Sequence, residues 1–204
     1  MTKQALLIFS KNPEAGKVKT RLAASIGDEA ALSVYRQLLL HTVSITSYLP
    51  VDKFVFYSNK METEDVWENN HYFKQMQVGR DLGEKMEKAF ASVFQQGYDK
   101  TAIIGTDCIE LNASIIMNAF VYLDRHDVVI GPAKDGGYYL LAMKKLHPDL
   151  FKEISWSTNK VLEQTLAVCN CHNLSAYLLP ELSDIDNEED LKRAKEQLQS
   201  NKFL

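Results

Sequence analysis

Short apolar runs alternate with segments of helical periodicity along this chain, and this alternation is the feature that most constrains its fold. Clear apolar runs lie at 4–10, 53–58, 101–105 and 127–131. The first is continuous rather than alternating, as expected for a strand that is covered on both faces. Strands separated by helical patterns indicate a parallel or mostly parallel sheet between helices. We therefore expect an α/β fold, a three-layer α/β/α sandwich with a mostly parallel sheet.

The same patterns predict the other elements. Apolar residues at helical spacing indicate a long helix from 28 to about 48, with Asp28 as its N-cap. Asn112 and Thr158 are the expected caps of later helices, and Asn187 with Asp190 resembles a capping box. The further expected elements are a short polar helix at 64–69, a short strand at 76–78, helices around 86–94, 112–123, 158–166 and 188–199, and strands at 138–143 and 176–179.

Charge and patterning exclude several classes of protein. The 204 residues carry a net charge of -4, so we expect no nucleic-acid partner, and any anion site must be a local cluster. The first apolar run is too short for a membrane span and no signal-peptide cleavage pattern follows it, so we expect a cytoplasmic protein. No repeat or Gly/Ser-rich linker interrupts the chain, which predicts a single domain over 1–204.

The chain has three cysteines, Cys108, Cys169 and Cys171, which is too few for a disulfide framework. Cys169 and Cys171 belong to a Cys-Asn-Cys-His cluster that could bind a metal. A zinc knuckle needs a second pair of ligands at a set spacing, and the sequence contains none. A helix end with small buried thiols is the alternative that we favour for this cluster.

The strand expected at 4–10 runs into a basic loop at 11–21. This loop contains four cations and a Pro-x-x-Gly turn: Lys11, Lys17, Lys19 and Arg21, with Pro13 and Gly16. It is not a Walker P-loop, because Val18 follows Gly16-Lys17, and no G-x-G-x-x-G motif is present. A glycine that admits a ligand to the backbone, together with the cations, indicates phosphate binding. The alternative is a solvated basic loop.

Carboxylates follow the later strands. In a parallel sheet, ligands bind outside the carboxyl ends of the strands. Asp107 follows the apolar strand at 101–105, where it either caps a helix or binds magnesium; Asn112 is the better cap. The run Asp135-Gly136-Gly137 is either a hairpin turn or part of a site. A helix cap requires neither Asp184 nor Asp186, so both aspartates need another explanation.

Five motifs at these positions occur in an order that resembles a known family. They are Lys11-x-Pro13-x-x-Gly16-x-x-Lys19-Thr20-Arg21-Leu22, Gly79-Arg80-Asp81-Leu82-Gly83-x-x-Met86, Gly105-Thr106-Asp107-Cys108, Gly131-Pro132-Ala133-x-Asp135-Gly136-Gly137-Tyr138-Tyr139-Leu140 and Asp184-Ile185-Asp186-x-x-x-Asp190-Leu191. The chain resembles bacterial glycosyltransferase-A-like transferases of unknown specificity over residues 4 to about 195. Their relatives include phospholactate guanylyltransferase and molybdenum cofactor guanylyltransferase. The resemblance implies the Rossmann-like fold of nucleotide-diphospho-sugar transferases.

The resemblance also implies a set of site residues. Asp107 and Asp186 match aspartates that bind a metal, Mg²⁺ or Mn²⁺. The implied nucleotide-binding residues lie in the first motif, in the second motif near the base and ribose, and in the fourth motif: Lys11, Pro13, Gly16, Lys17, Lys19, Thr20, Arg21, Asp81, Leu82, Gly83, Gly136 and Gly137. The candidate catalytic residues are Lys19, Arg21, Asp107 and Asp135.

The leading functional hypothesis is metal-dependent nucleotidyl transfer from a nucleoside triphosphate to a small phosphorylated or carboxylated acceptor. In it, Lys17, Lys19 and Arg21 stabilise the departing pyrophosphate. A second hypothesis is glycosyl transfer from a nucleotide-sugar, with Asp135 as the acceptor base. A third is a non-catalytic module that binds nucleotide without turnover. The sequence does not indicate the base, the acceptor or the oligomeric state, and fold alone does not choose among these reactions.

Overall fold

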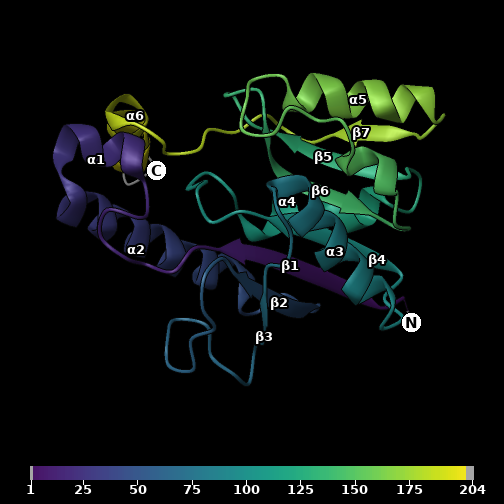
Figure 1. Cartoon of the computed structure of the whole chain (residues 1–204), viewed down its shortest axis with the longest axis horizontal. Helices are drawn as coiled ribbons and strands as arrows, with labels where there is room; N and C mark the ends of the chain where they lie inside the picture. The colour runs from purple at the N-terminus through teal and green to yellow at the C-terminus, as the bar shows by residue number, and fades with distance from the viewer. Residues whose placement is uncertain (1, 201–204) are drawn as a thin grey trace.

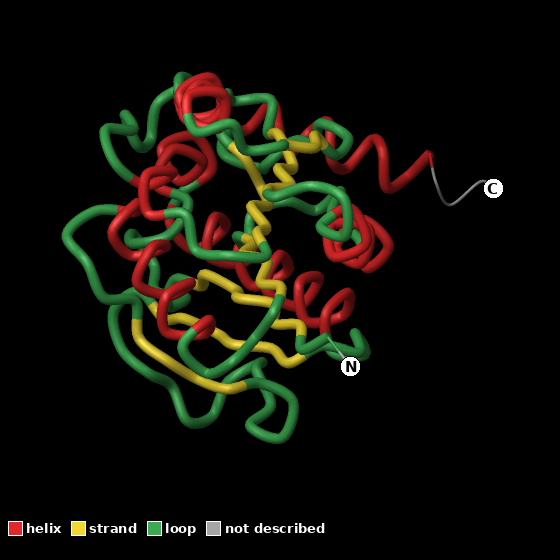
Figure 2. The backbone as a smooth tube through the Cα atoms, turned by 90° about the vertical axis from the view of Figure 1, so that its right-hand side faces the viewer, coloured by secondary structure: helices red, strands yellow, loops and turns green. Residues whose placement is uncertain are grey.

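The computed structural model describes residues 2–200, which form one seven-stranded sheet with helices on both faces (Figures 1 and 2). The strands are β1 (Gln4–Ser10), β2 (Asp52–Tyr57), β3 (Phe73–Met76), β4 (Lys100–Ile104), β5 (Val128–Pro132), β6 (Tyr138–Met143) and β7 (Ala176–Leu178). The helices are α1 (Thr20–Ile26), α2 (Asp28–Thr46), α3 (Leu82–Phe94), α4 (Ala113–Tyr122), the 3-10 helix η1 (Pro148–Phe151), α5 (Val161–Cys171) and α6 (Glu188–Ser200). The domain predicted over 1–204 includes Met1 and 201–204, which lie outside the described residues.

The strand order is β3-β2-β1-β4-β6-β5-β7. The pairs β1–β2, β1–β4, β2–β3 and β5–β7 are parallel, whereas β6 is antiparallel to both β4 and β5. Figure 2 shows the strands as a yellow column between helices on either side. The predicted α/β sandwich with a mostly parallel sheet is confirmed, and β6 is its antiparallel strand. No helix within residues 2–200 is long and apolar enough to cross a membrane.

Burial on both faces explains the continuous apolar run of β1. Leu6 and Ile8 face one core, in which they join residues of α2 and α4 such as Tyr35. Leu7 faces the opposite core, in which it joins residues of α3 and η1 such as Phe90. Successive side chains of a strand point to opposite faces, so every position of a doubly covered strand favours an apolar residue.

A third, smaller core lies apart from the sheet. It joins α1, α2, the segment before α6, and α6 through Leu22, Ala31, Leu38, Ile185 and Ala194. In Figure 1, α1 and α6 lie together at the left, beyond one end of α2. The backbone N–H of Ile185 donates to the carbonyl of Asp107 at 3.0 Å. This small core therefore brings the segment at 184–186 to the carboxyl end of β4.

Several local predictions are confirmed. Asn112 caps α4 by accepting from the Ile115 N–H at 3.0 Å, and β7 is an edge strand, opposite β3 at the other edge. Asn187 and Asp190 cap α6 reciprocally, because the side chain of each accepts from the backbone N–H of the other. The helices expected around 86–94 and 188–199 appear as α3 and α6.

Other local predictions are wrong. Residues 64–69 form bends and a turn rather than a helix, because the Asp65 carboxylate accepts from the Trp67 N–H and competes with helical hydrogen bonds. Asp28 is the first residue of α2 rather than its cap, which is Gly27. Thr158 does not cap α5, which begins at Val161 after Lys160. The strand expected at 76–78 lies earlier, at Phe73–Met76.

The hairpin interpretation of Asp135-Gly136-Gly137 is confirmed, since these residues connect the antiparallel strands β5 and β6. The Asp135 carboxylate accepts from the Gly137 N–H at 2.9 Å. Gly136 has a φ of +87°, and its carbonyl accepts from the Leu162 N–H at 2.9 Å at the start of α5. The turn is therefore fixed against α5.

Gly136→Ala should lower the free energy of unfolding by about 3 kcal/mol, through a strained φ and a clash. An added Cβ would lie 2.3 Å from the Asn159 carbonyl oxygen, which is backbone and cannot turn away. Gly97→Ala is the matched control, because Gly97 has a φ of +83° and open space around it. That control should lose only about 1 kcal/mol. Urea denaturation measures both; equal losses would show that the contact with Asn159 does not matter.

Candidate functional site

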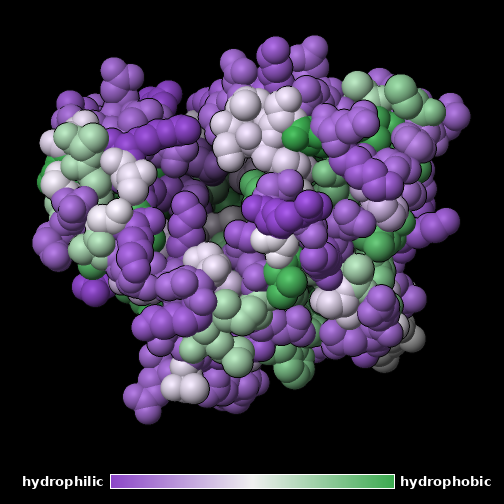
Figure 3. Space-filling model, viewed as in Figure 1, coloured by the Kyte–Doolittle hydropathy of each residue, from purple (hydrophilic) through white to green (hydrophobic). Residues whose placement is uncertain are grey.

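A cleft lies where β1 and β4 end, and it has two connected chambers that share Lys11, Tyr35, Leu82, Asp107, Tyr138, Ser157 and Asp184. The acidic chamber has a volume of about 610 Å³ and is lined in addition by Val18, Lys19, Thr20, Arg21, Asp135, Gly137, Trp156, Thr158, Asn159, Val161 and Asp186. The apolar chamber, of about 430 Å³, is lined in addition by Phe9, Ser10, Ser58, Gln77, Lys85, Met86, Ile103, Ile104, Gly105, Thr106, Cys108 and Tyr139. Figure 3 shows a recess between the part that contains α1 and α6 and the rest of this face.

Lys19 is at the centre of the acidic chamber. Its Nζ lies 2.7 Å from the Asp107 Oδ1 and 3.3 Å from the Asp186 Oδ1, and only 4% of its side chain is exposed. Arg21 is 74% exposed and its guanidinium lies 3.7 Å from Asp186. One buried ammonium group therefore joins two carboxylates that stand 79 residues apart in the numbering, from 107 to 186.

The local backbone directs Lys19 inward. Lys19 has a φ of 49°, in the left-handed region, and it immediately precedes α1. Val18 beside it is buried in the main core, and Leu22 of α1 is buried in the small core. Burial alone lowers the pKa of Lys19, but the ion pair with Asp107 and the nearby Asp186 outweigh burial and raise that pKa. Lys19 therefore remains charged.

Asp184 also lines both chambers, and no hydrogen bond or ion pair joins its side chain to another residue within 2–196, the range over which side chains are described. Burial raises the pKa of Asp184 to about 7, with Asp107 as the next cause, while Lys19 opposes the shift. An aspartate with a pKa this high binds its proton more tightly in the folded state than in the unfolded state. Its charged form is therefore unfavourable in the folded protein.

Asp184→Asn should stabilise the protein above pH 7 in chelator, by about 2 kcal/mol at pH 8. The folded pKa is raised, so the native protein loses stability as pH rises from about 4 to about 7, and the variant escapes this loss. The difference should vanish near pH 4. Thermal unfolding between pH 4 and pH 8 measures it, with Glu181→Gln, an exposed carboxylate, as the control. A constant difference across this range would refute the assignment to Asp184.

The first predicted motif divides between the cleft and the surface. Lys11, Lys19, Thr20 and Arg21 line the acidic chamber. The others do not line either chamber: Pro13 borders a separate hollow near Trp67, Gly16 sits in the turn with a φ of +74°, and Lys17 is exposed and paired with Glu14 at 2.6 Å.

The second predicted motif lies beside the cleft. Asp81 caps α3 by accepting from the Glu84 N–H at 2.8 Å, and Leu82 lines both chambers. Gly83 packs against the Trp156 indole, where an added Cβ would lie 2.2 Å from Nε1. Glycine at 83 therefore allows α3 to approach the wall of the acidic chamber.

Tyr35 connects the loop after β1 to the loop after β4. Its hydroxyl accepts from the Lys11 N–H at 2.9 Å and lies 3.2 Å from the Thr106 Oγ1. Tyr35 lines both chambers, so these contacts hold the two loops together beside the cleft. Tyr35 lies within the helix expected from 28 to about 48, and helical periodicity does not indicate a position beside a site.

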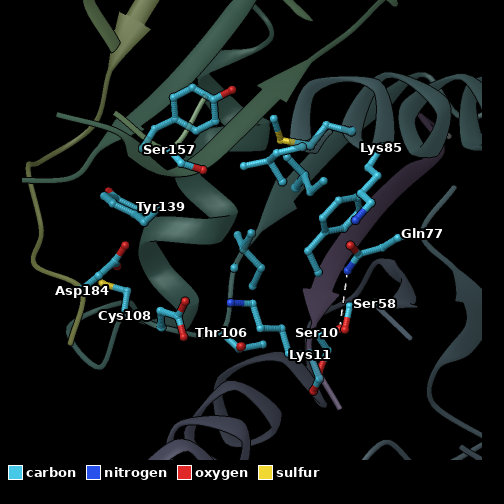
Figure 4. A pocket seen from close by; sticks show the side chains of 18 of the residues that line it. Ser10, Lys11, Ser58, Gln77, Lys85, Thr106, Cys108, Tyr139, Ser157 and Asp184 are labelled. Atoms are coloured by element: carbon cyan, nitrogen blue, oxygen red, sulfur yellow. Dashed lines mark hydrogen bonds between the residues drawn. The ribbon is translucent and has the colours of Figure 1, made fainter. Parts of the chain in front are cut away.

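Three polar residues of the apolar chamber, Ser58, Gln77 and Lys85, were also not predicted. In Figure 4, Lys85, Gln77 and Ser58 lie on one side, and Tyr139, Cys108 and Asp184 lie on the other. The Gln77 Nε2 donates to the Phe56 carbonyl at 2.9 Å. Lys85 forms no ion pair within residues 2–200. A chamber with apolar walls and a few convergent polar groups suits a small organic ligand.

The donor set of the acidic chamber suits a hard divalent cation. Asp107, Asp184, Asp186 and Asp135 supply carboxylate oxygens, and Asp184 lacks a partner of its own. Hard cations such as Mg²⁺ prefer oxygen ligands. No three His, Cys, Asp or Glu side chains within residues 2–200 converge as a ready metal site. The ammonium of Lys19 lies between the two predicted metal ligands, Asp107 and Asp186.

Comparisons with known proteins agree on the fold. A family model described as "Uncharacterized protein conserved in bacteria (DUF2064)" matches residues 42–158. The chain is similar to a protein from Desulfovibrio desulfuricans G20 whose crystal structure is provisionally described as that of a nucleotide-diphospho-sugar transferase. The two sequences are 31% identical, and the structures superpose with a TM-score of 0.85 over 94% of this chain and 85% of that chain. No curated protein sequence matches the chain.

Two distant structures, each 11% identical, share the fold alone. One is the 4-diphosphocytidyl-2C-methyl-D-erythritol synthase of Anaerococcus prevotii DSM 20548, with a TM-score of 0.61 over 97% of this chain and 96% of that chain. The other is the glucosyl-3-phosphoglycerate synthase of Mycobacterium tuberculosis in complex with Mg²⁺ and uridine diphosphate, with a TM-score of 0.53 over 90% of this chain and 70% of that chain.

Proposed function

The chain belongs to the DUF2064 family, and we propose that it is a metal-dependent transferase that uses a nucleotide. The observation that carries this proposal is the cluster of Asp107, Asp184, Asp186, Lys19 and Arg21 at the carboxyl ends of the strands. Carboxylates that hold a cation beside basic side chains are what phosphate transfer requires, because its catalysis rests on positioning and charge. We extend the proposal to a single domain over 1–204.

The nucleotide would occupy both chambers. Its phosphates would lie in the acidic chamber, near Arg21 and Lys11, and its ring in the apolar chamber against Phe9 and Met86. Lys85 and Gln77 would then meet the polar edge of the ring. In this placement the charged phosphates lie near basic side chains and the apolar ring lies against apolar side chains, within connected chambers.

The preferred reaction is nucleotidyl transfer. An ionised oxygen of a small phosphorylated or carboxylated acceptor attacks the α-phosphorus of a nucleoside triphosphate, a new P–O bond forms, and the bond to the β-phosphate oxygen breaks to release pyrophosphate. A divalent cation on Asp107 and Asp186 would supply charge stabilisation at the phosphate oxygens. Arg21, with its exposed guanidinium, would hold the leaving pyrophosphate.

Glycosyl transfer from a nucleotide-sugar is the second candidate, because Asp135 lines the acidic chamber, where it would act as the acceptor base. The product separates the two reactions. Pyrophosphate release identifies nucleotidyl transfer, and a free nucleoside diphosphate identifies glycosyl transfer. Binding without any turnover would identify a non-catalytic module.

The test is a thermal-shift panel of nucleoside triphosphates and nucleotide-sugars, each with and without Mg²⁺ or Mn²⁺. A ligand at one hundred times its Kd stabilises the native state by about 2.7 kcal/mol, which raises the Tm of a chain of this size by roughly 5 to 10 °C. We expect one nucleotide class to produce this shift only together with the cation. A flat panel would refute a nucleotide-dependent function.

A further inference from the structure

Lys19 holds the two carboxylates that the proposed function assigns to a metal. Its Nζ lies within hydrogen-bond distance of Asp107 and contacts Asp186, and its side chain is 4% exposed. An ammonium group and a divalent cation cannot both lie between these oxygens. Either the metal takes a different position, or it replaces the lysine.

We propose that a divalent cation displaces the Lys19 ammonium from Asp107 and Asp186, and that the released lysine turns into the acidic chamber to bind the nucleotide phosphates. This inference rests on the proposed function, because it assumes that these aspartates bind the metal. Lys19 would thus hold the site together before the metal binds and contact the substrate afterwards.

Three features of the chain support the exchange. Asp184 lines the same chamber, and no hydrogen bond or ion pair joins its side chain to another side chain within 2–196, so a divalent cation would find a further carboxylate in the chamber that Lys19 does not use. The lysine stem is long and flexible, so its head can turn without movement of α1. The small core anchors the backbone on both sides of the pair, through Leu22 and Ile185.

The exchange predicts a change in the chemical reactivity of Lys19 in the native protein. A buried, ion-paired amine resists acetylation, and a released amine does not. Acetylation by an N-hydroxysuccinimide ester, read by peptide mass spectrometry, should increase about tenfold or more at Lys19 when Mn²⁺ or Mg²⁺ saturates the protein. Lys17 is already 67% exposed and serves as the internal control, with no expected change.

Metal affinity gives an independent measurement. Lys19→Met removes the competing cation and should tighten Mn²⁺ binding about 30-fold in calorimetry without nucleotide. Arg21→Met removes a charge beside Asp186 that does not lie between the carboxylates, and it should tighten binding only a few-fold. Lys152→Met removes a surface charge that pairs with Asp149 and should change nothing. Lys19→Gln offers a milder substitution if the methionine variant folds poorly.

The outcomes separate this inference from the proposed function. If Mn²⁺ binds, Lys19 remains protected and Lys19→Met binds no tighter than the native protein, the exchange is refuted while the metal assignment stands. Equal gains for Arg21→Met and Lys19→Met would also refute it, because local charge would then explain both. If neither the native protein nor any variant binds Mn²⁺ or Mg²⁺, with or without nucleotide, the metal assignment fails and the exchange fails with it.

Discussion

Asp107→Asn should lower turnover on the order of 10³-fold, because loss of a metal carboxylate removes several kcal/mol of charge stabilisation at the transition state. Asp107 occupies the one position where the end of β4, the Lys19 ammonium and both chambers meet. The asparagine keeps the shape of the side chain but not its charge. Turnover is measured as pyrophosphate or nucleoside diphosphate release with the nucleotide selected by the thermal-shift panel.

The folded state should survive this change. The Asp107 side chain is 39% exposed, so the loss of its charge costs less than it would at a buried site. The buried Lys19 loses one partner but keeps its contact with Asp186. Circular dichroism and thermal unfolding check this. Asp149→Asn makes the same change at an exposed aspartate away from the cleft and should retain full turnover. An active Asp107→Asn protein would show that Asp107 is not a metal ligand.

Lys19→Met should lower the free energy of unfolding by about 2 kcal/mol in chelator at pH 8. Removal of the ammonium leaves Asp107, Asp184 and Asp186 close together without the buried charge that balances them. Loss of one partner of a fully buried pair costs about 3 to 5 kcal/mol, and the partial exposure of Asp107 and Asp186 reduces this value.

Lys17→Met is the matched control for this stability measurement. Lys17 also pairs with a carboxylate, Glu14 at 2.6 Å, but its side chain is 67% exposed. Exposed pairs contribute at most about 1 kcal/mol, so this variant should unfold close to the native protein. Urea denaturation of the three proteins gives the comparison. If Lys19→Met is as stable as Lys17→Met, the buried lysine does not hold the site together.

Much of the fold could be predicted from sequence, because doubly covered strands leave a strong signal. The continuous apolar run became β1, and helical periodicity located α3 and α6. The sequence of a turn leaves a weaker signal. Asp135-Gly136-Gly137 fits a hairpin or a site equally well, and in the structure it forms a hairpin whose Asp135 and Gly137 also line the cleft. The sequence therefore did not reveal that β6 runs antiparallel. Asp28 is not the cap predicted from its residue type, because Gly27 occupies the cap position of α2 without a side-chain hydrogen bond.

The sequence predicts which residues belong to the candidate site, but it does not predict the contacts between them. The positions of Asp107 and Asp186 followed from motifs, but their shared lysine depends on how the small core folds the segment at 184–186 back toward β4. The sequence marked Asp184 as an aspartate that no helix cap requires, but no local pattern shows that it is buried. Gln77 and Lys85 lie in ordinary strand-end and helix positions, so only the tertiary structure places them in the apolar chamber.

The contact between Lys19 and Asp186 also sets when the site can first exist. Strands β1 and β4 are complete by residue 104, yet Asp186 stands near the end of a chain of 204 residues. During synthesis on the ribosome, Lys19 and Asp107 would therefore precede their third partner, which follows 79 residues after Asp107. A protein shortened before residue 184 could retain all seven strands. It would nevertheless lack Asp184 and Asp186, which are two of the four carboxylates that line the acidic chamber.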